Sequence, residues 1–179
     1  MHYRLMIVLA CIVILAACSK AVPEAEVDPA EQGAALLVPF KTKLKYELVT
    51  SMQAGLDEAI ATCNTAAPGI AASLSVDGVV MGRSSHKLRN PANAAPDWVA
   101  LWFERYLAGQ SQPVSVELDD GRHGYIEPIM TQPLCLTCHG QDLQPEVAEK
   151  LAQLYPEDQA TGFAQGDFRG VFWVEFQAD

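Results

Sequence analysis

Cys135-Leu136-Thr137-Cys138-His139 is the stretch from which the rest of this chain is best understood. Two thiols separated by two residues and followed directly by histidine form the C-x-x-C-H spacing that attaches a c-type haem. Cys135 and Cys138 are therefore expected to bond covalently to the two haem vinyl groups, and His139 to ligate the iron. The motif predicts one covalently attached haem c.

The N-terminus has the features of an export signal, which the motif requires because haem c is attached after export. Residues 1–4 are a short basic start, and residues 5–15 are an apolar run too short to span a membrane. We therefore predict a signal peptide at residues 1–17 and an exported protein whose domain faces the periplasm.

The end of the apolar run resembles the lipobox of a bacterial lipoprotein. Leu15-Ala16-Ala17-Cys18 places small residues before a cysteine, and in such proteins the cysteine carries acyl chains after cleavage. Two or more chains anchor a protein stably to a membrane. Cys18 is thus the predicted lipidation site, and Ser19 favours the outer membrane of a two-membrane cell. The alternative is an ordinary cleavable signal in which Cys18 is incidental.

Composition indicates one acidic domain. The chain has 179 residues and a formal net charge of −10 at pH 7. After removal of the signal peptide, enough residues remain for one hydrophobic core but not comfortably for two. The acidic balance argues against nucleic acid and anionic lipid as partners, and it suits a basic redox partner.

One cysteine remains once the others have been assigned. Of the five, Cys11 leaves with the signal peptide, Cys18 is assigned to lipid, and Cys135 and Cys138 to haem. Cys63 then has no disulfide partner within the chain, which is notable in an exported protein. Its simplest interpretation is a small buried hydrophobe.

The folded domain is expected to begin near Lys41. Residues 18–40 are dominated by Ala, Pro, Glu, Asp and Gln, with no regular apolar period before Leu36. This composition is typical of a flexible tether, with a poorly packed first helix as the alternative. Residues 41–179 are assigned to the haem c domain.

An apolar stripe at three- and four-residue steps predicts a helix of roughly five turns at the start of the domain. The stripe consists of Leu44, Leu48, Met52, Leu56, Ile60 and Cys63. Cys63 is therefore expected to point toward the core near the helix C-terminus. The turn-rich residues 64–69 are expected to end the helix.

The rest of the chain predicts short strands and helices. Strands are expected at 70–76 and 79–83, at 114–118 and 125–130, and at 170–176. Helices are expected at 97–107 and 145–154. The fold class is α+β, with an antiparallel sheet of about five strands and helices on one side.

Four sequence blocks in order resemble a known family, over roughly residues 44–176. The chain is similar to the exported, PAS-like c-type haem domains catalogued as a domain of unknown function, which occur alone or as sensor parts of bacterial signalling proteins. The resemblance implies a PAS-like sheet and an iron held by His139 and by a cysteine thiolate that matches Cys63. The blocks are residues 63–68, 82–93, 134–140 and 155–170.

The sixth iron ligand must reach the haem face opposite His139. Cys63 is favoured because it is unpaired, lies on an inward stripe and precedes a turn. An open iron position stays possible at this point. So do the other neutral ligands, which are Met52, Met81, Met130, His86 and His123.

Further haem contacts are expected from charged and aromatic side chains. Arg89 and Arg169 can pair with the haem propionates, because a guanidinium matches carboxylate geometry, or they can brace turns. The three tryptophans can line the haem or, as the more common outcome, pack in the core. They are Trp98, Trp102 and Trp173.

Thiolate ligation favours a redox or small-gas sensor. A thiolate stabilises ferric iron, so a low potential is expected, and loss of Cys63 on reduction would let CO or NO bind. The partner would be an unidentified redox or signalling protein. The alternative is a low-potential electron-transfer cytochrome of the periplasm. An enzyme is not expected, because a filled sixth position leaves no site for turnover.

Other uses of the C-x-x-C spacing fit the sequence less well. A thioredoxin-like site calls for a βαβ context, and a structural zinc site calls for two more ligands at matching spacing. The single remaining cysteine, Cys63, does not supply them.

Overall fold

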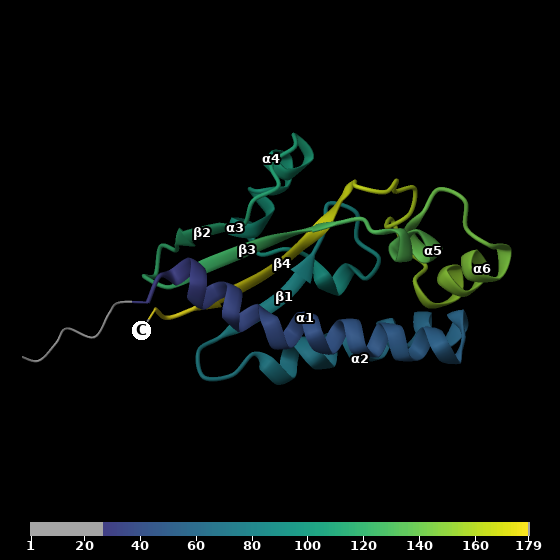
Figure 1. Cartoon of the computed structure of the whole chain (residues 1–179), viewed down its shortest axis with the longest axis horizontal. Helices are drawn as coiled ribbons and strands as arrows, with labels where there is room; N and C mark the ends of the chain where they lie inside the picture. Colours follow the sequence, from purple (N-terminus) through teal and green to yellow (C-terminus); the bar gives the residue numbers. More distant parts are fainter. Residues whose placement is uncertain (1–26, 179) are drawn as a thin grey trace, which may run out of the picture.

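The computed structural model describes residues 27–178 (Figure 1). The predicted signal peptide 1–17, the lipidation site Cys18 and the first part of the predicted tether lie outside these residues. Within the described part of the chain, no helix is both long enough and apolar enough to cross a membrane.

The sheet is antiparallel and has four strands in the order β1-β4-β3-β2. They are β1 (Val80–Ser84), β2 (Val114–Glu117), β3 (His123–Met130) and β4 (Phe168–Phe176). The expected α+β class and antiparallel pairing are confirmed. The expected number of about five strands is wrong, because residues 70–74 form the end of a helix and only 80–84 of the predicted hairpin form a strand.

Two long helices form a hairpin that packs on one face of the sheet. They are α1 (Pro29–Ala54) and α2 (Leu56–Leu74), with Gly55 alone between them. Gly55 has φ 138°, a conformation that side chains rarely adopt, so the helical stripe cannot continue through it. The single helix expected over residues 44–63 is therefore two helices.

The start of the folded domain is earlier than expected, because helix α1 already includes residues 29–40. Asp28 caps it, with its side chain accepting a hydrogen bond of 2.9 Å from the backbone N–H of Ala30. Leu37 and Phe40 are fully buried against the sheet. The predicted tether is thus wrong for residues 29–40. The alanine-rich composition of this segment indicated a linker. In the structure, these small residues allow α1 to lie close to the strands.

Helix α2 continues through the residues that were expected to end it. Pro68 lies inside the helix, and the side-chain amide of Asn64 donates a hydrogen bond of 3.2 Å to the carbonyl of Leu154. Ile70 and Leu74 pack against the hydrophobic core under α1. Tertiary packing therefore outweighs the local cost of proline, and Cys63 lies in the middle of α2 rather than near its end.

The second face of the sheet is covered by two short helices, α3 (Asp97–Ala100) and α4 (Phe103–Leu107). They replace the single helix expected at 97–107, and they correct the expectation that helices cover one side only. The three tryptophans Trp98, Trp102 and Trp173 belong to this second core. Their expected role in core packing is confirmed.

The helical hairpin extends past the end of the sheet, toward the C-x-x-C-H segment (Figure 1). That segment forms a short turn at Pro133–Cys135 and the one-turn helix α5 (Leu136–His139). Helix α6 (Pro145–Leu154), as expected from sequence, packs on α2 through a third apolar cluster that includes Ile60 and Leu151. The hairpin and this segment form two walls that face each other.

Gly33 shows how closely α1 approaches the sheet. A Cβ placed there would clash with Cβ and Cγ of the Tyr125 side chain. We predict that Gly33→Ala lowers the free energy of unfolding by about 1–3 kcal/mol, because this overpacking outweighs the better helix propensity of alanine.

Gly69 is the matched control for this prediction. It is also helical, but a Cβ there meets nothing within 4 Å. Gly69→Ala should therefore stabilise the protein by about 0.5–1 kcal/mol. Denaturant unfolding of both variants measures the difference. Equal effects of the two substitutions would contradict the packing described here.

Candidate functional site

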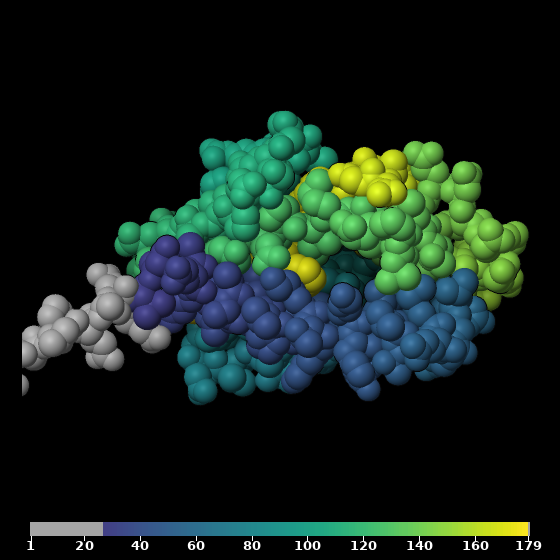
Figure 2. All heavy atoms as spheres, in the orientation of Figure 1, coloured from purple at the N-terminus to yellow at the C-terminus, as the bar shows by residue number. Residues whose placement is uncertain are grey.

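A cavity lies between the helical hairpin and the C-x-x-C-H segment. Figure 2 shows the hollow between the blue helices and the green segment above them. Its volume is about 210 Å³. Enclosed ligand pockets usually span about 300–1,000 Å³, so a large flat group would keep one edge in solvent or move the walls apart. All four residues expected to attach or ligate haem line this cavity, namely Cys63, Cys135, Cys138 and His139.

The C-x-x-C-H segment is held by its own backbone and by a neighbouring loop. Cys135 Sγ accepts a hydrogen bond of 3.4 Å from the backbone N–H of Gln132. After the motif, a Cβ on Gly140 would lie 2.6 Å from the carbonyl oxygen of Leu136, so only glycine fits this turn. Phe163 N–H donates to the carbonyl of His139 at 3.0 Å, which pins the end of the motif.

His139 is oriented by a hydrogen bond on its inner nitrogen. Its Nδ1 lies 2.6 Å from the carbonyl oxygen of Ala160, so Nδ1–H donates and Nε2 carries the lone pair, which faces the guanidinium of Arg169 at 3.5 Å. Burial, followed by the positive charges of Arg169 and Arg89, lowers the pKa of His139 from 6.5 to about 2. The side chain is therefore a neutral imidazole with Nε2 available, which is the form that ligates a metal.

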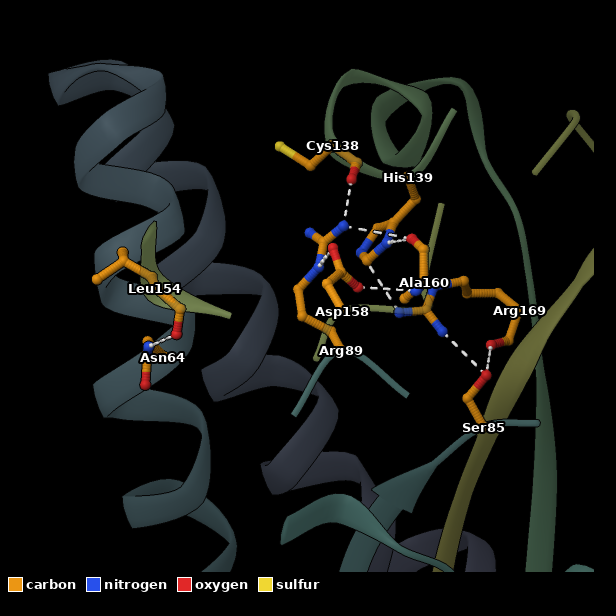
Figure 3. A network of polar contacts seen from close by, with 9 residues as sticks. All are labelled: Asn64, Ser85, Arg89, Cys138, His139, Leu154, Asp158, Ala160 and Arg169. Carbon is orange, nitrogen blue, oxygen red and sulfur yellow. Dashed lines mark hydrogen bonds and ion pairs between the residues drawn. The ribbon is translucent and has the colours of Figure 1, made fainter. Parts of the chain in front are cut away.

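A buried ion pair holds in place the backbone groups that orient the histidine. Asp158 accepts from Nε of Arg89 at 3.0 Å and from the backbone N–H of Ala160 at 2.7 Å (Figure 3). Arg89 also donates to the carbonyl oxygens of Cys138 and Ala160. One arginine and one carboxylate thus tie the segment after β1 to the motif and to the loop that carries Ala160. Asp158 thereby braces the turn that leads to Ala160.

Arg169 occupies the base of the site, on β4. Its guanidinium lies 3.5 Å from His139 Nε2 and donates to Oγ of Ser85 at 3.1 Å. Burial, with smaller contributions from Arg83 and Arg89, lowers its pKa to about 10. Both arginines that were expected at the propionates therefore line the cavity, but each already has polar partners. Whether they contact a cofactor stays a prediction.

Cys63 faces the motif from the opposite wall. It lies one residue before Asn64 on α2, and the Cys138 sulfur points into the space between the motif and this helix (Figure 3). Burial is the main cause that raises the pKa of the Cys138 thiol, and the nearby Cys63 raises it further.

The cavity narrows the set of candidate sixth ligands. Among the described residues, Cys63 and Met52 line it, whereas the other four candidates lie elsewhere. Met81 is in the core under α1, and His86 stacks on Phe168 with ring centroids 5.5 Å apart. His123 packs on Phe176 at the far end of β3. Met130 follows a bulge in β3 and does not reach the cavity.

The residues of the cavity fit an iron porphyrin. Thiols and an imidazole stand on two facing walls, and within residues 27–178 no three His, Cys, Asp or Glu side chains gather closely enough to chelate one ion. Because these ligating side chains are distributed over two walls, they suit a ligand wide enough to contact both walls at once. The described lining contains four cationic side chains and no acidic one. This charge suits the two propionate carboxylates of a haem, which pair with cations. The cations are Arg83, Lys87, Arg89 and Arg169.

Sequence reasoning missed two features of this site. Arg83 was seen only as part of a sequence block, yet its side chain lines the cavity. Ala160 gives no signal in its side chain, because it acts through its carbonyl oxygen, so only the folded backbone reveals its contact with His139.

The fold and site define a class, a small α+β domain with a C-x-x-C-H segment facing a cysteine across a basic cavity. The model of the Tll0287-like family matches residues 21–176, and the chain belongs to this family. Its structure is similar to the crystal structure of the cyanobacterial heme-protein Tll0287, with a TM-score of 0.57 and 23% sequence identity, covering 84% of this chain and 97% of that one. Among curated proteins, none matches this chain.

The Arg89–Asp158 pair gives a test of the site's bracing. Its side chains are only 12% and 10% exposed. We predict that Asp158→Asn lowers the free energy of unfolding by about 3 kcal/mol, because it leaves a buried guanidinium without its counter-charge. Chemical denaturation measures the loss.

Asp120→Asn is the matched control for this substitution. Asp120 also pairs with an arginine, Arg122, at 2.7 Å, but it is exposed at the surface. Its substitution should change stability little, because water screens an exposed pair. A loss at Asp158 no greater than that at Asp120 would show that the buried pair does not brace the site.

Proposed function

We propose that this chain is an exported haem c protein that acts as a redox or small-gas sensor through thiolate and histidine ligation. The observation that carries the proposal is that Cys63 and His139 line one cavity from opposite walls, together with both thiols of the C-x-x-C-H motif. Membership of the Tll0287-like family and similarity to a structure titled as a heme-protein support the haem assignment.

Each residue has a distinct role in this proposal. Cys135 and Cys138 would hold one haem covalently through thioether bonds, and His139 would ligate its iron through Nε2. When bound, haem supplies a one-electron redox centre and an iron that can take small gases. The carbonyl of Ala160 keeps the imidazole oriented, and an acceptor on Nδ1–H raises its basicity as a ligand.

Cys63 would be the residue that responds to redox state. It binds as a thiolate, and an anionic ligand favours ferric iron, so a low reduction potential is expected. After a redox partner delivers one electron, Cys63 Sγ would release the iron and take up one proton from solvent. Because Cys63 lies in the middle of α2, its release would alter the contact of that helix with the motif.

Electron transfer is the second candidate function. The mouth of the cavity is open, and Leu134, 46% exposed, stands beside it. An apolar, accessible edge of this kind suits brief docking of an electron-transfer partner. In this case Cys63 and His139 would both stay bound to the iron in both oxidation states.

The cellular setting is part of the same proposal. We place the protein on a bacterial membrane, with lipid on Cys18 as anchor and the outer membrane as its site, and with its domain in the periplasm. The PAS-like character of the sheet, a redox or signalling partner, and the absence of enzymatic turnover also belong to the proposal.

Substitution of Cys63 tests the ligand assignment. We predict that Cys63→Ala, co-expressed with the haem c maturation system, keeps covalent haem but loses the ferric thiolate spectrum and raises the midpoint potential. Met52→Leu is the matched control, since Met52 lines the same cavity. An unchanged Cys63→Ala spectrum with an altered Met52→Leu spectrum would assign the ligand to Met52 instead.

Addition of CO separates the two candidate functions. If the protein is a sensor, the thiolate signature disappears on reduction and the reduced form binds CO. A carrier keeps its coordination on reduction and does not bind CO. Ferric, ferrous and CO-treated spectra of the mature domain distinguish the two, and a coordination that is unchanged in all three would rule out the ligand switch.

A further inference from the structure

Arg83 stands out among the basic residues of the cavity because its charge is not used by the fold. It lies on β1 opposite Phe172, which also lines the cavity. Among the described residues, its side chain makes no hydrogen bond and no ion pair, although it is half-buried. Its nitrogens are not among the buried side-chain atoms that lack a partner, so solvent reaches them and they can bind an anion that enters the cavity.

The other basic residues of the cavity already have partners. Arg89 pairs with Asp158, and Arg169 donates to Ser85. Lys87 lies 3.4 Å from the carbonyl oxygen of Thr161 and 5.0 Å from the centre of the Phe163 ring. Of the four cations that line the cavity, Arg83 is the one whose side chain makes no hydrogen bond or ion pair among the described residues.

The position of Arg83 places its charge toward the main cavity. Side chains alternate along β1, so Arg83 shares the face of Met81, which packs under α1 and α2. Arg83 also borders a smaller hollow near Pro68 and Trp173. It lines the main cavity as well, next to its cross-strand neighbour Phe172 and together with Arg89 and Arg169.

We propose that Arg83 is the carboxylate-binding residue of this cavity and that its guanidinium binds a haem propionate through charge-assisted hydrogen bonds. This inference rests on the proposed haem function. It changes the prediction made from the sequence, in which Arg89 and Arg169 were the residues expected to contact the propionates. In this assignment Arg89 and Arg169 position the motif and its histidine, while Arg83 binds the cofactor's acid group.

The pH dependence of the midpoint potential reports on such a pair. Reduction adds an electron and so raises the pKa of a nearby propionate, and the potential therefore falls as pH rises between the oxidised-state and reduced-state pKa values. The positive charge of Arg83 lowers both pKa values and moves this window to lower pH. Besides the motif's own residues, the titratable groups that face the space are Cys63, Lys87, Arg89, Tyr155 and Arg169.

The experiment compares holoprotein of wild type, Arg83→Gln and Arg83→Lys by potentiometry over a range of pH. We expect Arg83→Gln to lower the potential at neutral pH and to move the titration window upward by about one pH unit. Arg83→Lys should restore most of the wild-type profile, because it keeps the charge. Arg105→Gln is the matched control, because it removes an equal charge from an exposed position on α4.

Three results would overturn the inference. One is a profile of Arg83→Gln that matches wild type and Arg105→Gln. Another is loss of folded protein in both Arg83 variants, since a residue without partners in the fold should not be needed for folding. The third is a wild-type profile that moves when malonate is added, which would mean that a free carboxylate from solution fills the site.

A failure of the proposed function gives a different result. A wild-type protein without covalent haem, judged by its pyridine haemochrome spectrum after co-expression with the maturation system, would refute the haem assignment itself. A haem-loaded wild type with an unaffected Arg83→Gln profile would refute only the role of Arg83.

Discussion

The hydrogen bond from His139 Nδ1 to the carbonyl of Ala160 is the contact on which the geometry of the site depends. Asp158 holds Ala160 in place by accepting from its backbone N–H, and Arg89 holds Asp158 while donating to the motif backbone. The imidazole is thus fixed before any ligand arrives. Because this network is buried, removing one charge leaves the other without compensation, and the motif loses its orientation along with its stability.

The helical hairpin supplies the opposite wall. Gly55 turns the chain between α1 and α2, and α2 then runs back past the motif with Cys63 facing it. The same helix packs on α6 through Ile60 and on the sheet core through Ile70. A change of ligation at Cys63 would therefore act on a helix that contacts both ends of the domain. This connection supports the proposed sensing role.

Charge is distributed unevenly in this protein. The chain carries a net charge of −10, yet the described lining of its main cavity has four cations and no acid. The cost of gathering these cations is visible at Arg169. Its burial and the neighbouring arginines lower its pKa to about 10. Such an arrangement is unfavourable for an empty fold and becomes favourable when an anionic group enters. The basic cavity is thus better explained by a ligand than by stability.

The sequence by itself predicted haem chemistry for the motif and determined much of the sheet. C-x-x-C-H needs only local spacing, and the strands near 114–130 and 168–176 follow from alternation and from the turn at Asp119-Asp120-Gly121. It predicted α6 but missed the helical residues 29–40 and 64–74, because these are helical through packing against the sheet rather than through their own pattern. Only the tertiary structure decided that Arg89 is paired with Asp158, while the side chain of Arg83 has no hydrogen-bond or ion-pair partner within residues 27–178. Partners of this kind lie far apart in the chain and meet only when the backbone brings them together.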